Sequence, residues 1–262
     1  MNKVVFPGFN LNFEFSSIAI QFGSLHIYWY SICIVLGIIV SLILMYFTTK
    51  KHNIKYDELI EIMIFTLVFG IIGARLFYVL FNLEYYLKNI NEIFNINGGG
   101  LAIFGGIMFG AATSYIICKH RKINFLDFCD YLVPYLALSQ SIGRLGNFFN
   151  VEAYGIETKN VFRMGIETIS GYKEVHPCFL YEMVGCLLIF IILKLLEKKQ
   201  NYKGEILGYY LIMYGVIRFF IEALRADSLI AFNIKISQFI SVIIVILGIV
   251  IHKKYKMSKN VD

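Results

Sequence analysis

Long apolar runs occupy most of this chain, and basic residues gather between them. A run of about 20 apolar residues is long enough to cross a bilayer as a helix. The first run opens with Tyr28, Trp29 and Tyr30, aromatic residues of the kind that anchor a span at a membrane interface. The pattern predicts an all-α, polytopic membrane protein with seven spans, at about 28–47, 59–81, 101–118, 128–149, 178–196, 206–224 and 236–251.

The fourth run is the least regular of the seven. It contains Pro134, Gly143 and Gly146 together with Arg144. Proline and glycine inside a membrane helix are typical of kinks and breaks, so we expect this span to be kinked or broken.

The segments outside the runs are short. Residues 1–23 are polar and aromatic, and we expect them to lie along the membrane interface and to be retained. Residues 150–176 are rich in Gly, Glu and Thr and predict a small extracytoplasmic segment. We therefore expect one integral-membrane domain over residues 1–262.

The placement of Lys and Arg predicts the orientation of the spans. Of the 24 basic residues, 14 lie at 50–55, 119–122, 194–203 and 253–259, whereas seven lie in the loops of the other side. Cytoplasmic loops carry the excess of Lys and Arg in membrane proteins. We expect the C-terminus in the cytoplasm and the N-terminus outside, so that the glycine run at 98–100 and the segment 150–176 share the outer side.

The composition agrees with a membrane protein and excludes other classes. Hydrophobic residues make up 58% of the 262 residues, charged residues only 16%, and the mean hydropathy is +0.68. The basic residues flank apolar runs and form no stripe with stacking aromatics, so we expect no nucleic-acid partner. The five Cys and five His residues have no metal-binding spacing, so we expect no metal and no cofactor.

Polar residues gather in the stretch 141–155, at the end of the fourth run. Arg144 and Asn147 are three residues apart and can face one pocket, and Asn150 and Glu152 follow. Arginine is suited to bidentate recognition of phosphate. The alternative is a helix contact through small residues, with an arginine that snorkels to the interface.

A second polar group lies on the sixth run. Tyr214, Arg218, Glu222 and Arg225 are spaced by four, four and three residues and share one helix face. Ionisable residues inside a membrane are functional candidates by default. Two cations face one anion, so we expect an anionic partner. The alternative is a neutral ladder that only fixes helix packing.

Three weaker features stay open between structural and functional roles. The glycine run before the third span can expose backbone N–H groups to an anion or allow close helix packing. Arg75 on the second span can be either a structural group or part of a site. Glu182, at the start of the fifth span, is expected to be a structural partner of one buried arginine.

Four segments together resemble the motifs of bacterial prolipoprotein diacylglyceryl transferases. They are GGLAIFGG at 99–106, GRLGNFFNVEAYG at 143–155, HPCFLYE at 176–182 and YGVIRFFIEALR at 214–225, in the order of that family. The resemblance implies transfer of the diacylglyceryl group of phosphatidylglycerol to the lipobox cysteine thiol in the signal peptide of a prolipoprotein. The products are a thioether and glycerol phosphate, and the site faces the outer leaflet of the cytoplasmic membrane.

The same resemblance implies roles for individual residues. The residues that it assigns to catalysis are Arg144, Arg218, Glu152, Tyr30 and Tyr214. The residues that it assigns to binding of phosphatidylglycerol are Arg144, Asn147, Gly105, Gly155, Arg218, Glu222 and Arg225. Phe104 departs from the pattern, because many members have a histidine there that is assigned as the base for the thiol. We expect the proton to go to Glu152, Tyr30, Tyr214 or the phosphate.

Two other classes of protein are compatible with the residues alone. A transporter of lipid or of an anionic solute could use the intramembrane arginines as its anion site. A membrane scaffold without catalysis would leave the charged groups mutually neutralised.

Overall fold

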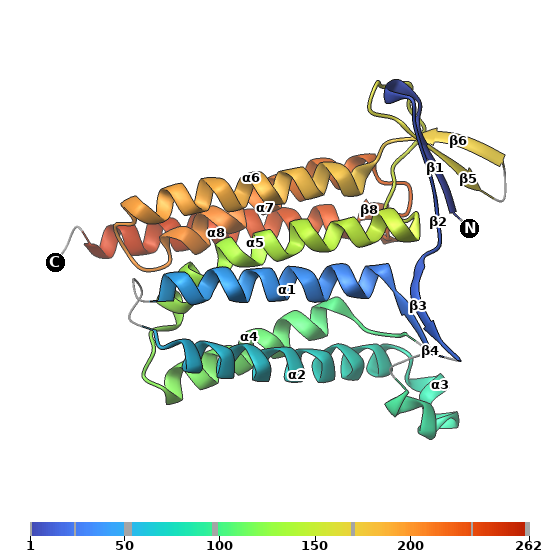
Figure 1. The fold of residues 1–262 in the computed structure, drawn as a ribbon. Helices are drawn as coiled ribbons and strands as arrows, with labels where there is room; N and C mark the ends of the chain where they lie inside the picture. The colour runs from blue at the N-terminus through green and yellow to red at the C-terminus, as the bar shows by residue number, and fades with distance from the viewer. Residues whose placement is uncertain are drawn as a thin grey trace. The chain divides into compact units, whose positions relative to one another are not determined.

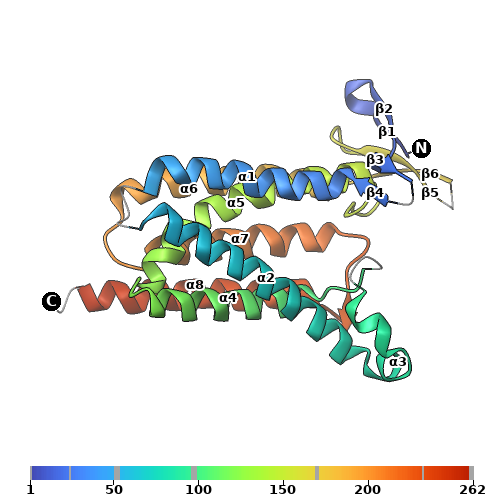
Figure 2. The same cartoon turned by 60° about the horizontal axis from the view of Figure 1, so that its bottom comes forward.

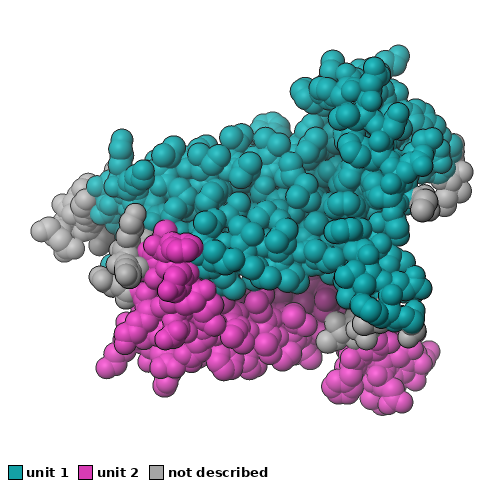
Figure 3. All heavy atoms as spheres, in the orientation of Figure 1, with its two compact units in different colours: residues 1–45, 129–262 teal, residues 46–128 magenta. Residues whose placement is uncertain are grey.

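The structure is a computed structural model and describes residues 2–23, 25–49, 54–95, 99–168, 171–231 and 233–259. Lys50, Lys51 and Gly98, which entered the predictions above, lie outside the described residues. The chain is mostly helical (69%). It divides into two compact units (Figure 3): residues 1–45 with 129–262, and residues 46–128.

Most of the first unit is built from five helices, two of which, α1 and α5, continue into the second unit. They are α1 (Trp29–Thr48), α5 (Phe125–Asn150), α6 (Cys178–Leu196), α7 (Glu205–Leu224) and α8 (Ile236–Lys259). Helix α7 packs against α6 and along α8 (Figures 1 and 2). Small residues allow the close approach, since a Cβ on Gly215 would lie 2.9 Å from the carbonyl oxygen of Ser241.

In the part of the chain that the structure describes, five helices are long and apolar enough to cross a membrane. They cover Trp29–Thr48, Tyr56–Phe81, Cys178–Lys199, Glu205–Leu224 and Ile236–Lys254. By length and composition, this finding is consistent with the predicted membrane protein. The predicted third and fourth spans are helical too, but neither meets that measure of length and composition, so seven spans and the orientation of the termini stay predictions.

Helix α5 is continuous from Phe125 to Asn150, with Pro134 inside it. The helix is therefore not broken, and the alternative of a kink in this span stays a prediction. A proline removes only one backbone hydrogen bond of a helix, and the surrounding turn is held by packing, because Tyr131, Val133 and Tyr135 are all buried.

A four-stranded antiparallel sheet forms where a lead-in along the interface was predicted. Its strands, in the order β2-β1-β5-β6, are β1 (Asn2–Phe6), β2 (Leu11–Phe15), β5 (Met164–Thr168) and β6 (Gly171–Val175). One face buries Val4, Ile166 and Val175 against Ala153 and Phe179. The N-terminal hairpin is thus joined to the segment between α5 and α6, and the sheet covers the ends of both helices.

Two short hairpins complete the first unit, along with a one-turn 3-10 helix after β1 and another after α6. Strands β3 (Ile18–Phe22) and β4 (Leu25–Tyr28) lead into α1, and β7 (Ile230–Ala231) and β8 (Ile234–Lys235) join α7 to α8. Strand β4 ends one residue before Trp29, the first residue of α1.

The second unit contains α2 (Tyr56–Phe81), α3 (Leu83–Lys88), the 3-10 helix η3 (Ile90–Phe94) and α4 (Ile103–His120). Helices α2 and α4 pack closely at Gly73 and Gly105, because a Cβ on Gly73 would lie 2.7 Å from the carbonyl oxygen of Gly105. Helix α4 starts three residues after Gly100, whose φ of +80° is a conformation that favours glycine.

Candidate active site

One buried carboxylate joins the two arginines of the candidate site. Glu182 on α6, with its side chain 2% exposed, accepts a hydrogen bond at Oε1 from Arg144 Nη2 of α5 at 2.6 Å. Its Oε2 accepts from Arg218 Nη1 of α7 at 2.9 Å. Three helices therefore converge on one pair of oxygens, and each bond is strengthened by charge.

Tyr214 is also part of this cluster. Its hydroxyl donates to Glu182 Oε1 at 3.4 Å, from one helical turn before Arg218. The tyrosine ring stacks on Tyr210, with ring centroids 5.7 Å apart, and this contact fixes its direction. The face predicted for the sixth run thus points at the same carboxylate as Arg144.

The remaining residues of that face form a chain of ion pairs. Arg218 Nη2 lies 2.7 Å from Glu222 Oε2, and Arg225 Nε lies 4.0 Å from the same oxygen. Arg225 then donates to both carboxylate oxygens of Asp227, at 2.8 and 2.6 Å. The hydrogen bond from Arg225 holds the pKa of Asp227 below its usual value.

The prediction of an uncompensated positive charge does not describe this cluster. Arg144 and Arg218 are matched by Glu182 and Glu222, and Arg225 is matched by Asp227. Sequence spacing counted only the ladder on one helix, whereas Glu182 comes from α6 and Asp227 from the loop after α7.

A second chain of contacts runs from Arg144 to Glu152. Arg144 Nη1 donates to Asn147 Oδ1 at 3.3 Å, and Asn147 Nδ2 donates to Glu152 Oε1 at 2.9 Å. Asn150 Nδ2 reaches the same oxygen at 3.3 Å. Arg144, Asn147, Asn150 and Glu152 are therefore brought together in one chain of contacts, and Glu152 is its exposed end.

Backbone strain flanks Glu152. Val151 and Ala153 have φ values of +53° and +56°, which L-residues rarely adopt. Such conformations cost roughly 1–3 kcal/mol each and persist only where the surroundings impose them. The main-chain bond from Glu152 N to Asn147 O, at 3.1 Å, closes the end of α5 and imposes the turn.

Main-chain hydrogen bonds tie together the ends of the three helices that carry the cluster. Gly155 N donates to His176 O at 2.7 Å, Ile156 N to Leu224 O at 2.8 Å, and Ala226 N to Tyr154 O at 3.4 Å. A Cβ on Gly155 would lie 2.7 Å from Cys178 Sγ and from Leu224 O. Gly155 thus serves a close junction of three segments, which we call the helix-end junction.

Lys235 reinforces the end of α7 from the hairpin β7–β8. Its Nζ donates to the carbonyl oxygens of Glu222, Ala223 and Arg225 at 2.9, 3.1 and 3.2 Å. A cation is favourable at a helix C-terminus, where carbonyl groups lack partners. Lys235 therefore fixes the end of α7, beside Glu222 and Arg225.

Tyr30 lies on α1 at its contact with α5. A Cβ on Gly146 would lie 2.6 Å from Tyr30 Cδ2 and 2.9 Å from Tyr30 Cα, so the backbones touch at Gly146. By contrast, a Cβ on Gly143 would meet nothing nearer than 4.0 Å. Two of the glycines of the stretch 141–155, Gly146 and Gly155, therefore serve close backbone packing.

Gly105 and Phe104 belong to the second unit, on the first turn of α4. Gly105 packs against Gly73, and Phe104 is exposed. Arg75 organises the loop before this helix: it donates to the carbonyls of Glu92 at 2.5 Å, Ile93 at 2.8 Å, and Gly99 and Gly100 at 2.9 Å. The sequence left a structural and a functional role open for Arg75, and these bonds support the structural role.

Sequence reasoning missed three contributors, which are Asp227, Lys235 and the second contact of Glu182. The sequence HPCFLYE was a signal for Glu182, since a carboxylate that enters a membrane helix needs a cationic partner. Among the described residues, no group of three or more His, Cys, Asp or Glu side chains could hold a metal ion.

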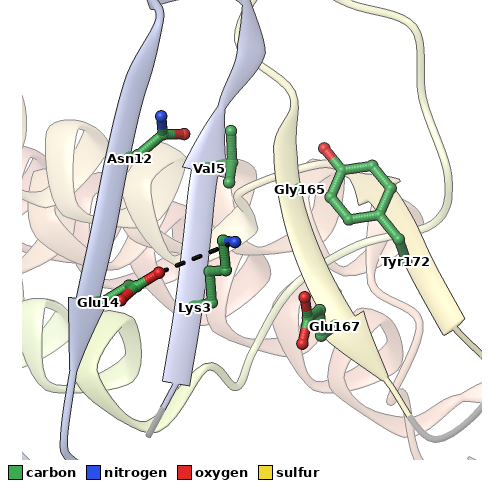
Figure 4. Close-up of a pocket in the computed structure, with 7 residues that line it drawn as sticks. All are labelled: Lys3, Val5, Asn12, Glu14, Gly165, Glu167 and Tyr172. Carbon is green, nitrogen blue, oxygen red and sulfur yellow. Dashed lines mark ion pairs between the residues drawn. The ribbon is translucent and has the colours of Figure 1, made fainter.

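A hollow of about 340 Å³ lies elsewhere, on the outward face of the four-stranded sheet (Figure 4). Lys3 and Glu14 form an exposed ion pair there at 3.8 Å, and Tyr172 lies across Gly165. The lining also includes Val5, Asn12 and Glu167, and it contains none of the predicted site residues.

Comparison with known proteins decides the family. The sequence model described as "Prolipoprotein diacylglyceryl transferase" matches residues 17–253. The chain belongs to the prolipoprotein diacylglyceryl transferase family. Its resemblance in four motifs is confirmed, and the protein is a transferase with several apolar helices of membrane-spanning length.

Relatives of this transferase are similar over nearly their whole length. A phosphatidylglycerol–prolipoprotein diacylglyceryl transferase of Finegoldia magna is 42% identical over 240 residues, covering 91% of this chain and 95% of the relative. Proteins of the same name from Streptococcus mutans (42% over 241 residues, 89% and 93%) and Clostridioides difficile (40% over 243 residues, 93% and 96%) are similar too.

Proposed function

We propose that this transferase moves the diacylglyceryl group of phosphatidylglycerol to the lipobox cysteine thiol of a prolipoprotein. The observation that carries the proposal is the convergence of Arg144 and Arg218, from two helices, on the two oxygens of one buried carboxylate. Two guanidiniums that reach one carboxylate can also reach two oxygens of one phosphate. The names of the relatives supply the two substrates.

The arginines act on the leaving group. The cysteine sulfur forms a bond to the terminal glycerol carbon of the diacylglyceryl group, and the bond from that carbon to the phosphate oxygen breaks. Glycerol phosphate leaves with the electron pair of that bond. Guanidinium groups held in advance stabilise the negative charge that develops on the phosphate oxygen, and such stabilisation is often the largest single contribution to catalysis.

The proton of the thiol goes to a nearby acceptor on the protein or to the phosphate. Glu152 is exposed and is held by Asn147 and Asn150, and Tyr30 and Tyr214 are the other candidates. Phe104 cannot take a proton. A thiol with an ordinary pKa near 8.5 needs only modest help to ionise. Phe104→His should therefore change the rate by less than about tenfold, and a larger acceleration at unchanged substrate affinity would identify a missing base.

The site works at the outer leaflet of the bacterial cytoplasmic membrane. In this proposal the chain is a single membrane domain that crosses the bilayer seven times, with its C-terminus in the cytoplasm and residues 150–176 outside. The excess of Lys and Arg on one side supports that orientation. It brings the stretch 141–155 to the leaflet that a secreted prolipoprotein enters.

A mass measurement tests the proposed function. The purified protein is incubated with phosphatidylglycerol vesicles and a peptide that carries a lipobox cysteine, and the peptide is weighed. We expect the mass of one diacylglyceryl unit to be added, and no addition with Arg144→Ala or with a peptide whose cysteine is replaced by serine. An unmodified peptide with the wild-type protein would exclude the transferase proposal, and movement of lipid between leaflets in the same vesicles would then favour a transporter.

A further inference from the structure

The two arginines of the site already hold an internal anion. Arg144 and Arg218 contribute two positive charges, and Glu182 and Glu222, both almost fully buried, contribute two negative charges. Glu182 alone contacts both guanidiniums. These four side chains are neutral as a set before any ligand arrives.

Simple addition of a lipid phosphate to this set would be unfavourable. A phosphodiester would bring a further negative charge next to two buried carboxylates, where repulsion is weakly screened. The incoming phosphate also needs guanidinium N–H donors, and Glu182 accepts from one on each arginine, Nη2 of Arg144 and Nη1 of Arg218. The carboxylate and the phosphate therefore compete for the same donors.

We propose that Glu182 is an internal competitor in the phosphate site, and that the lipid phosphate binds by replacing the Glu182 carboxylate on Arg144. This proposal rests on the function proposed above, because it takes the donor lipid as the source of the phosphate. It makes Glu182 a positioning residue, since it acts through the arginines. Ion pairs exchange, and no covalent bond changes in this step.

The exposure of the two arginines indicates which contact exchanges. The Arg144 side chain is 25% exposed, whereas that of Arg218 is 15% exposed and is held by Glu222 as well. Glu182 can leave Arg144 and keep Arg218 through Oε2, and the Tyr214 hydroxyl remains beside Oε1 as a donor. The displaced carboxylate therefore keeps two partners, which limits the cost of its burial.

The competition has a consequence for product release. Glycerol phosphate is a phosphomonoester and carries a charge of about −1.5 to −2 at pH 7, more than the diester from which it came. A pair of arginines without a counter-ion would hold this product more tightly than the substrate. The return of Glu182 to Arg144 expels it, so that the enzyme can turn over.

Binding measurements on the full chain in detergent micelles test the proposal. The probes are glycerol phosphate, dioctanoylphosphatidylglycerol and uncharged dioctanoylglycerol. In Glu182→Gln, both phosphate ligands should bind at least about tenfold more tightly, with the larger gain for glycerol phosphate, because one buried negative charge is gone. Binding of dioctanoylglycerol should not change.

Glu205→Gln is the matched control. Glu205 is a buried carboxylate at the opposite end of α7, where its Oε2 accepts from Asn201 N at 2.6 Å, and its replacement should leave the affinity for both phosphates unchanged. Phosphate binding in Glu182→Gln that is equal to or weaker than in the wild type would overturn the proposal. Glu182 would then be a permanent structural partner of both arginines.

Two further measurements separate a variant that fails to fold from a proposal that is wrong. If Glu182→Gln does not fold, Glu182→Asp decides, since it keeps the charge but is one methylene too short to hold both arginines and should also bind phosphate more tightly. Unchanged or weaker binding in Glu182→Asp would overturn the proposal as well. A wild-type protein that fails in the mass assay contradicts the proposed function, whereas an active wild type without the gain in Glu182→Gln contradicts only this inference.

Discussion

Among the described residues, arginines that are partly or fully buried have two kinds of partner. Arg144 and Arg218, in the first unit, end on a carboxylate that they share. Arg75, in the second unit, is 7% exposed and ends on four backbone carbonyls, with the rings of Tyr78 and Tyr86 at 5.9 and 5.2 Å from its Cζ. No carboxylate pairs with Arg75 among the described residues.

The difference separates the site that we propose for an anion from an arginine that holds a loop together. Carbonyl groups of a loop cannot be replaced by a ligand without unfolding the loop, so the donors of Arg75 are committed to structure. A carboxylate side chain can move, and in our proposal Glu182 leaves Arg144 for the phosphate while it stays on Arg218. For these arginines we therefore infer that the kind of partner, and not burial alone, separates a functional candidate from a structural group.

Among the variants that test this comparison, Arg218→Lys has the largest expected effect on activity. Lysine keeps the charge but loses the planar fork that reaches Glu182 and Glu222 at once. We expect the kcat/KM of diacylglyceryl transfer to fall by about 100-fold, because charge on the leaving phosphate is less well stabilised. The mass assay with the lipobox peptide measures it, and full activity would refute a two-pronged contact with phosphate.

Arg75→Lys should act on stability instead. A lysine cannot satisfy the four carbonyls that Arg75 binds, and each buried group left without a partner costs about 1–3 kcal/mol. We expect a clearly lower melting temperature in detergent, with activity per folded molecule reduced less than in Arg218→Lys.

Arg121→Lys is the control within the same unit. Arg121 pairs with Glu61 at 2.5 Å, and its side chain is 42% exposed, so the change should alter stability by less than about 1 kcal/mol. A loss of stability as large as that of Arg75→Lys would show that the backbone carbonyls are not the reason for the effect.

A pair of glycine substitutions compares two positions of α5, one before and one after Arg144. Gly146→Ala should cost about 1–3 kcal/mol, since its Cβ would collide with Tyr30 and push α1 from α5. Gly143→Ala has open space and should be neutral or stabilising by up to about 1 kcal/mol, because alanine favours a helix. Thermal unfolding of both variants measures the difference, and equal melting temperatures would contradict the close contact.

The smallest expected effect is that of Asp227→Asn on activity and on stability at low pH. Arg225 lowers the pKa of Asp227, so the pair contributes stability that is present above the ordinary Asp pKa of about 3.9 and is lost as the pH falls below it. Asp227 is half exposed, and solvent screens the pair. Asp227→Asn should therefore lower activity only about twofold at neutral pH and should flatten the decline of the melting temperature in acid; an unchanged acid profile would assign that decline to other groups.

The helices were predictable because their signal is local. Apolar runs of membrane length specify helices by composition, and the seven runs agree with helices in the structure within a few residues at most ends. The sheet was not predictable in this way. Strand β1 pairs with β5 some 160 residues later, and strands of five residues carry little signal of their own.

In the candidate site, too, local spacing was predictable and long-range contacts were not. The shared face of Tyr214, Arg218 and Glu222 follows from helical spacing, and so does the proximity of Arg144 to Asn147. Which helix faces meet does not follow from spacing, so Glu182 was expected to pair with one arginine and pairs with two. The charge balance of the site depends on how α5, α6 and α7 pack together, so the sequence of one helix could not predict it.

The helix-end junction sets what may vary in such a protein. Its bonds join main-chain groups of Gly155, Ile156, His176 and Leu224, so apart from Gly155 they place no demand on side-chain type. Other side chains around the junction can therefore change without loss of the bonds that hold the ends of α5, α6 and α7 together. A protein held in this way tolerates difference at many positions, and this chain differs from its relative in Finegoldia magna at more than half of the aligned ones.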